Sequence, residues 1–201
     1  MSDLYRTVKR LPSTELADHG FRYDRLKEGF FKTLSDDRSI SFLINGMWSH
    51  VELFVTLRFT DLNDTLFKAA CRADWPRERA QMFRLESIGL FLEKVGDYCG
   101  STEDIGIYCP PGSTIASPQD ISRRILKEVD RLTNLISLQH ALKYVCDHSL
   151  FEPLGSYMIP AAAMLVGDQK IWDWSTSHFA ETTSAGELPH YHALLKELER
   201  E

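Results

Sequence analysis

The residue types that hold metals are spread thinly along this chain. His190 and His192 form an H-x-H near the C-terminal end, but positions i and i+2 of a helix do not face each other. No cysteine or carboxylate stands at ligand spacing beside them. Cys99 and Cys109 have nine residues between them, and the sequence contains no C-x₂-C pair, which structural zinc sites use. We therefore expect no metal site.

A second candidate chemistry is a thiol paired with an imidazole, the arrangement that activates a cysteine nucleophile. Cys146 has His140 and His148 close to it in the sequence. All three fall on one expected helix, however, where Cys146 joins an apolar stripe and so resembles a core cysteine. The sequence also lacks a G-x-S-x-G nucleophile motif. We expect no nucleophile.

Phosphate-binding motifs and catalytic carboxylate pairs are the remaining catalytic signatures. The chain has neither a P-loop nor a G-x-G-x-x-G sequence, and the prolines of Pro110–Thr114 remove two of the amide donors that an anion site needs. Each carboxylate pair has a local explanation as turn, helix-start or loop chemistry. The pairs are Asp36/Asp37, Asp61/Asp64 and Glu103/Asp104. We therefore predict no catalytic residues and no cofactor. Whether the chain is an enzyme stays open, although these observations argue against it.

Charge divides the chain into two unequal parts. Residues 1–146 hold 20 acidic and 20 basic residues, whereas residues 147–201 hold 9 acidic and 3 basic ones, which accounts for the whole net charge of −6. Residues 95–122 contain neither Lys nor Arg. A field of one sign repels nucleic acids and anionic membranes and steers a basic protein partner. A solvated acidic face that maintains solubility is the alternative interpretation.

One basic stretch, residues 72–84, combines arginines with Trp75 and Phe83. Basic residues interleaved with aromatic ones are typical of nucleic-acid sites, whose affinity is mainly electrostatic. The acidic C-terminal part opposes such binding, so we expect the arginines to pair with the protein's own acidic residues.

Tryptophans and acidic residues together indicate a partner-binding surface. Trp172 and Trp174 point about 200° apart on a helix, so at most one of them is expected to face fully inward. A tryptophan with an acidic rim is typical of an interface hot spot. The predicted partner-binding residues are Trp172, Asp173, Trp174, Glu103, Asp104 and Trp48.

A β-hairpin is predicted around Asn45-Gly46, because these two residues accept the positive φ angles of a type I′ turn. The two faces of the hairpin follow from the alternation of apolar and polar residues along its strands. The apolar face carries Ile40, Phe42, Ile44, Val51, Leu53, Val55, Leu57 and Phe59, and the polar face carries Ser39, Ser41, His50, Glu52, Thr56 and Arg58. A longer loop through Met47–Ser49 with a bulge is the alternative.

Strands at Gly29–Leu34 and Phe21–Tyr23 are expected to precede the hairpin, and a helix starting at Thr60 or Asp61 can cover its apolar face. Residues 81–93 fit a strand or a short helix, and residues 96–117 read as a loop with one short strand at Ile105–Cys109. Helices follow at Ser117–Leu132, Leu135–His148, Gly155–Gly167, Ile171–Ala180 and Leu188–Arg200. In the first of them, an apolar stripe is predicted by residues that recur at helical spacing: Ile121, Ile125, Val129 and Leu132. The order predicts an α+β fold with an N-terminal antiparallel meander and a mainly helical C-terminal half. We expect one domain over residues 1–201, with lobes at 1–95 and 118–201 as an option.

Three segments resemble small acidic immunity proteins of bacterial polymorphic toxin systems: GFRYDRLKEGFFKT, HVELFVTLRF and IPAAAMLVGD. The likeness is one of general layout. It implies a cytoplasmic protein without an active site that neutralises a toxin domain through an acidic surface. The absence of an apolar signal segment and the four scattered cysteines favour the same compartment. The alternative is a small-ligand protein or an enzyme whose cleft uses His50, Glu52 and Arg58 on the polar sheet face.

Overall fold

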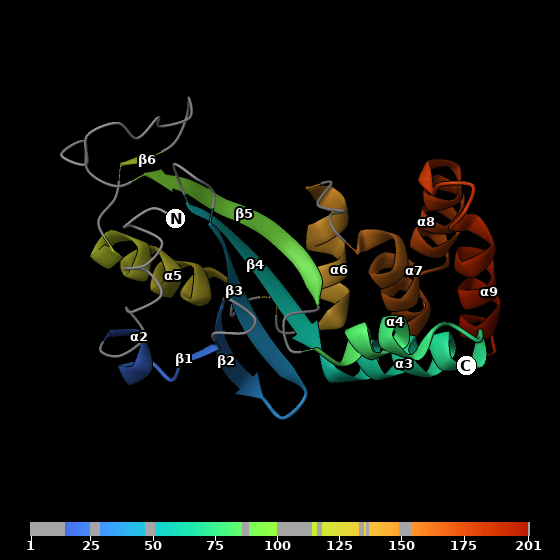
Figure 1. Ribbon diagram of the computed structural model, residues 1–201, viewed down its shortest axis with the longest axis horizontal. Coiled ribbons are helices and arrows are strands. Elements are labelled where there is room, and N and C mark those ends of the chain that lie inside the picture. Colours follow the sequence, from blue (N-terminus) through green and yellow to red (C-terminus); the bar gives the residue numbers. More distant parts are fainter. Residues whose placement is uncertain are drawn as a thin grey trace. The chain divides into compact units, whose positions relative to one another are not determined.

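The computed structural model describes residues 15–24, 29–46, 51–85, 89–99, 114–115, 118–132, 135, 137–148 and 154–200. These residues form an α+β fold (Figure 1) with two compact units, each built from two segments of the chain. The first unit comprises residues 1–56 and 93–134, and the second comprises residues 57–92 and 135–201. Within the described residues, no helix is both long and apolar enough to cross a membrane.

The sheet has the strand order β1-β2-β3-β4-β5-β6. Its first five strands form an antiparallel sheet, and β6 pairs with β5 in parallel. The strands are β1 (Arg22–Asp24), β2 (Gly29–Ser35), β3 (Arg38–Gly46), β4 (Val51–Phe59), β5 (Leu90–Cys99) and β6 (Thr114–Ile115). The two strands expected upstream of the hairpin are thus confirmed. The segment 81–93 proves to be mixed, because a 3₁₀ turn, η2 (Met82–Arg84), precedes β5.

The predicted two-residue turn at Asn45-Gly46 is wrong. Both residues belong to β3, and the Asn45 Nδ2 donates a hydrogen bond of 2.7 Å to the Glu52 carboxylate of β4. Residues 47–50 lie outside the described part of the chain. The predicted faces nevertheless hold, since all eight residues of the apolar face are buried. The period of two fixes the faces of a strand wherever its turn falls.

One further expectation about the sheet needs correction. The predicted loop over 96–117 begins later, because β5 continues to Cys99, and the strand suggested at 105–109 falls outside the described residues. The polar face is not open throughout: Ser41 is 0% exposed and Thr56 is 4% exposed. Small hydroxyl side chains tolerate this burial when they find hydrogen-bond partners.

The first unit contains α2 (Glu15–Asp18) and α5 (Pro118–Leu132), which pack against each other. The apolar stripe predicted for α5 is confirmed, because its four residues are buried: Ile121, Ile125, Val129 and Leu132. Spacings of three and four residues place them on one helix face.

The second unit is mainly helical. It contains α3 (Thr60–Arg72), α4 (Arg77–Gln81), α6 (Leu138–Asp147), α7 (Gly155–Val166), α8 (Gln169–Thr182) and α9 (Leu188–Leu198). The helix predicted to follow β4 is present as α3, which packs against α7, α9 and η2. Asn63 on α3 is fully buried and donates a 2.7 Å hydrogen bond to the Phe83 carbonyl oxygen of η2.

Candidate functional site

The candidate site is built around α8, whose start is defined by two local signals. Gly167 ends α7 with a left-handed φ of 72°, a conformation that favours glycine. The Asp168 carboxylate then accepts a 3.1 Å hydrogen bond from the Ile171 amide, which caps α8. The two helices therefore join through a turn of two residues, and α8 begins in a fixed orientation against α7.

The structure places Trp172, Asp173 and Trp174 on this helix, where they differ in exposure. Trp172 is half-buried, Asp173 is exposed, and Trp174 is 41% exposed. The indole of Trp174 stacks on the imidazole of His178, with ring centroids 5.3 Å apart and planes 12° from parallel. Gln169 donates a 2.7 Å hydrogen bond to the Asp173 carboxylate. Large apolar and acidic side chains thus reach the surface side by side.

Trp172 also lines a pocket of about 330 Å³ that opens to solvent. Its lining includes Met164 and Gly167 at the C-terminal end of α7, and Asp168 and Trp172 at the N-terminal end of α8. Glu199, at the C-terminal end of α9, contributes the second carboxylate. The sequence alone does not bring Asp168 and Glu199 together, because they are separated along the chain. A capping residue directly after Gly167 is the local signal that could have indicated Asp168.

The basic stretch 72–84 pairs with the acidic C-terminal part, as predicted. The guanidinium of Arg79 forms an ion pair with Glu187 and lies 4.4 Å from the centroid of the Trp75 ring. It also donates a 3.1 Å hydrogen bond to the Tyr157 hydroxyl. Hydrogen bonding to Glu187 raises the pKa of Arg79, and the same contact lowers the pKa of Glu187. Arg79 therefore acts in an internal ion pair.

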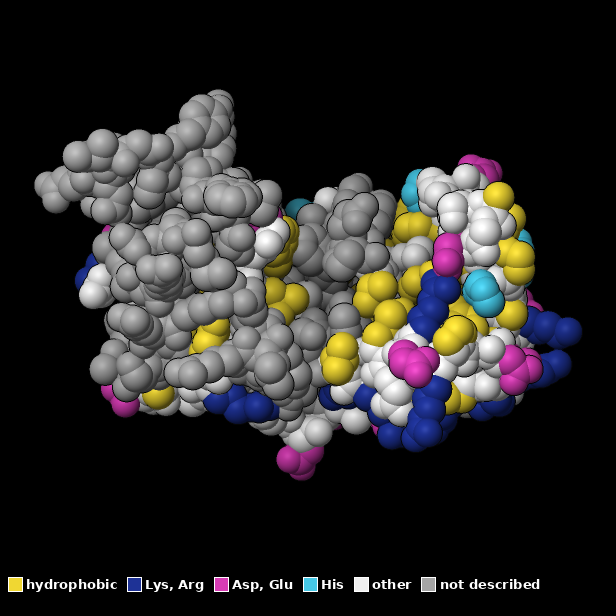
Figure 2. Space-filling view, viewed as in Figure 1, with side chains coloured by type: hydrophobic (Ala, Val, Ile, Leu, Met, Phe, Trp, Pro, Cys, Tyr) yellow, Lys and Arg dark blue, Asp and Glu magenta, His cyan; other side chains and the backbone are white. Residues whose placement is uncertain are grey.

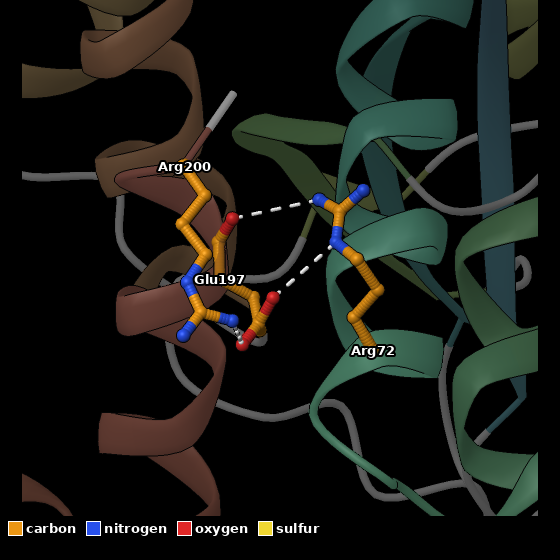
Figure 3. Close-up of polar contacts among 3 residues, drawn as sticks. All are labelled: Arg72, Glu197 and Arg200. Carbon is orange, nitrogen blue, oxygen red and sulfur yellow. Dashed lines mark hydrogen bonds and ion pairs between the residues drawn. The ribbon is translucent and has the colours of Figure 1, made fainter.

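A second internal pair lies at the end of α3. Figure 3 shows Arg72 and Arg200 on either side of Glu197. The Arg72 Nε lies 3.4 Å from a Glu197 carboxylate oxygen, and Glu197 is only 7% exposed. In Figure 2, Lys and Arg side chains gather along the edge where Figure 1 places α3 and α4, with acidic side chains among them. This intermixing weakens any field that would attract a nucleic acid.

The thiol and imidazole groups on and beside α6 lack the geometry of an activated nucleophile. Burial raises the pKa of Cys146 to about 11, so its thiol is protonated near neutral pH. The His140 Nδ1 lies 3.0 Å from the Ser137 hydroxyl. His148 stacks on Tyr144 and its Nδ1 lies 2.8 Å from the Tyr144 carbonyl oxygen. Each imidazole therefore faces a structural neighbour.

His190 and His192 lie on α9, where Trp75 packs edge-on to the His190 ring at 6.3 Å. Among the residues that the structure describes, no three His, Cys, Asp or Glu side chains gather as metal ligands. On the polar sheet face, Glu52 accepts from Asn45 and Arg58 is half-buried. His50 and three predicted partner-binding residues, Trp48, Glu103 and Asp104, lie outside the described residues.

In comparisons with protein-family models, with curated proteins and with solved structures, the chain had no match.

Proposed function

We propose that this chain is a non-catalytic binding protein that docks a basic protein partner on the exposed side of α8. More specifically, we propose that the chain is an immunity protein, which neutralises a cognate bacterial toxin by binding to it. The observation that carries the proposal is the exposure of Trp174 beside the exposed carboxylate of Asp173. Tryptophan is among the residues most enriched in binding hot spots.

The geometry of α8 supports a contact surface that extends beyond Trp174. His178 and Glu181 follow Trp174 at spacings of four and seven residues, so the three side chains share one helix face. His178 is half-buried and Glu181 is exposed. Because the imidazole stacks on the indole, the tryptophan is held in one orientation before any partner arrives. A preorganised anchor loses less conformational entropy on binding.

The charge distribution supports a basic partner. Internal ion pairs engage Glu187 and Glu197, whereas four carboxylates among the described residues of the C-terminal part are exposed: Asp147, Asp173, Glu181 and Glu199. Complementary charge mainly accelerates association and selects the partner. Association through such exposed charges weakens with salt, since the Debye length is about 10 Å at 0.1 M ionic strength.

The experiment has two stages. The tagged chain is first used to capture partners from its own host at low and raised salt, and the captured proteins are identified by mass spectrometry. The dissociation constant of the purified partner is then measured for the wild type, Trp174→Ala and Asp173→Lys. We expect each substitution to weaken the complex by about 2 kcal/mol or more, which is roughly thirtyfold in Kd.

Two controls match these substitutions in kind. Leu165→Ala truncates another exposed apolar side chain, on α7, and Glu78→Lys reverses an exposed charge on α4. Both should leave Kd within about threefold of the wild type, because they lie outside the proposed contact. Unchanged affinity in both Trp174→Ala and Asp173→Lys would show that the interface lies on another surface. Failure to recover any basic protein partner overturns the proposal.

A further inference from the structure

The pocket beside Trp172 has the composition of a cation site. Its lining includes one indole and two carboxylates, those of Asp168 and Glu199, and none of the residues that line it is Lys or Arg. A cation over the face of a tryptophan is stabilised by the ring quadrupole, by about 0.5–2 kcal/mol. The Asp168 carboxylate caps α8 through one oxygen, and a carboxylate has acceptor sites for further donors.

The same chain shows how such groups hold a guanidinium. Arg79 lies over the ring of Trp75 while its Nη2 bonds the Glu187 carboxylate. This internal site combines one tryptophan, one carboxylate and one arginine within the helical unit. The pocket presents a tryptophan and carboxylates to solvent, and arginine suits it better than lysine because the planar guanidinium stacks on aromatic rings and carries five donors.

The size and position of the pocket fit a side chain of a larger partner. About 330 Å³ lies at the low end of small-molecule sites, which span roughly 300–1,000 Å³. The pocket borders the proposed interface at Asp173, because Gln169, which lines the pocket, donates a hydrogen bond to the Asp173 carboxylate. A residue of a docked protein can thus enter the pocket while its neighbours contact α8.

We propose that this pocket receives an arginine side chain of the partner protein. The inference rests on the proposed function, because it assigns one contact of that same interface. Asp168 and Glu199 bind the guanidinium, and the Trp172 indole packs against its plane.

The test uses the full chain and a defined probe, Nα-acetyl-arginine methylamide, so it needs no partner. The indole N–H signals of the ¹⁵N-labelled protein are followed by NMR, and the signal of Trp172 is assigned with Trp172→Phe. We expect a saturable shift of the Trp172 signal. The corresponding norleucine derivative, which is apolar and uncharged, should cause no saturable shift, and the lysine derivative should bind several-fold more weakly.

Conservative substitutions test the carboxylates. Asp168→Asn keeps a capping residue, and Glu199→Gln keeps the size of the side chain. The double variant should bind the arginine probe roughly tenfold more weakly. Glu78→Gln removes an exposed carboxylate on α4, outside the pocket lining, and should leave probe binding unchanged. Circular dichroism and thermal melting verify that each variant is folded.

The pocket assignment and the proposed function are tested by different results. Absence of a saturable Trp172 shift, equal binding of the norleucine derivative, or unchanged binding by the double variant overturns the pocket assignment. The proposed function is judged separately, by the effect of Trp174→Ala and Asp173→Lys on the identified partner. Once that partner is purified, Asp168→Asn/Glu199→Gln should weaken the complex by about tenfold or more, and an unchanged Kd overturns the inference.

Discussion

Arg72 holds Glu197 from a position 125 residues earlier in the chain. Its Nε lies 3.4 Å from the Glu197 carboxylate, and its Nη2 donates a 3.4 Å hydrogen bond to the Glu197 carbonyl oxygen. One guanidinium therefore binds both the side chain and the backbone of the same residue near the end of α9. This contact ties α9 to α3, and α9 carries Glu199 to the pocket beside α8.

Arg72→Met should lower the free energy of unfolding by about 1–2 kcal/mol. The reason is that Glu197, which is nearly buried, keeps only Arg200 as an ion-pair partner among the contacts of Figure 3. The estimate lies between the value for exposed ion pairs and that for hydrogen bonds to charged groups. Urea denaturation followed by circular dichroism measures the difference.

The control for this prediction is Arg123→Met, which breaks an exposed pair with Asp120 on α5. It should change the unfolding free energy by less than about 0.5 kcal/mol. In the Arg72→Met background, Glu197→Gln should cost less than it does in the wild type, because contacting residues are not additive. Additive effects would contradict the coupling.

Asn63→Asp should destabilise the protein more at neutral than at acidic pH. Asn63 is buried and donates to the Phe83 carbonyl oxygen, whereas an ionised aspartate cannot donate and carries a buried charge. At acidic pH the protonated aspartic acid again has a donor. Asn63→Ala removes the donor at every pH, at a cost of about 1–3 kcal/mol. Urea midpoints across the pH range distinguish the two variants, and parallel profiles would contradict the prediction.

Glu187→Gln should remove a stabilisation that exists only when Glu187 is ionised. Hydrogen bonding to Arg79 lowers the pKa of Glu187 below its ordinary value of 4.5. A lowered folded-state pKa means that the contribution is complete above about pH 4.5 and is lost as the pH falls through the folded value. The difference in Tm between the wild type and the variant should thus stay constant near neutral pH and shrink in acid.

The matched control is Glu78→Gln, which removes an exposed carboxylate on α4, the helix that carries Arg79. A similar acid-dependent change in this variant would indicate a general charge effect rather than the Arg79–Glu187 pair.

Cys146 should resist alkylation while Cys71 reacts. The pKa of about 11 lies two units above the ordinary value of 9.0, so the thiolate fraction near pH 8 falls about a hundredfold. Cys71 is exposed on α3. Iodoacetamide labelling resolved by peptide mass spectrometry should show Cys146 reacting at least about tenfold more slowly. In urea the two cysteines should react at similar rates, and a fast Cys146 in the folded protein would point to an activated thiol.

Local sequence patterns specify the faces of the elements and many of their ends. The stripe from Ile121 to Leu132 is buried as its spacing predicted, and Gly167 ends α7 as glycine does in many helices. The α+β class also followed from the order of elements. These features depend on residues a few positions apart, so a local pattern contains the information that specifies them.

The packing of distant segments in the folded protein determines which faces meet. It carried β3 through Asn45 and Gly46, where a strong local turn signal was overridden by a longer strand pair. It packed α3 against α7 and α9. The sequence singled out Trp172, but its nearness to Glu199 depends on how α8 and α9 pack. Such contacts are set by the joint packing of several amphipathic surfaces, and no single segment of the chain encodes them.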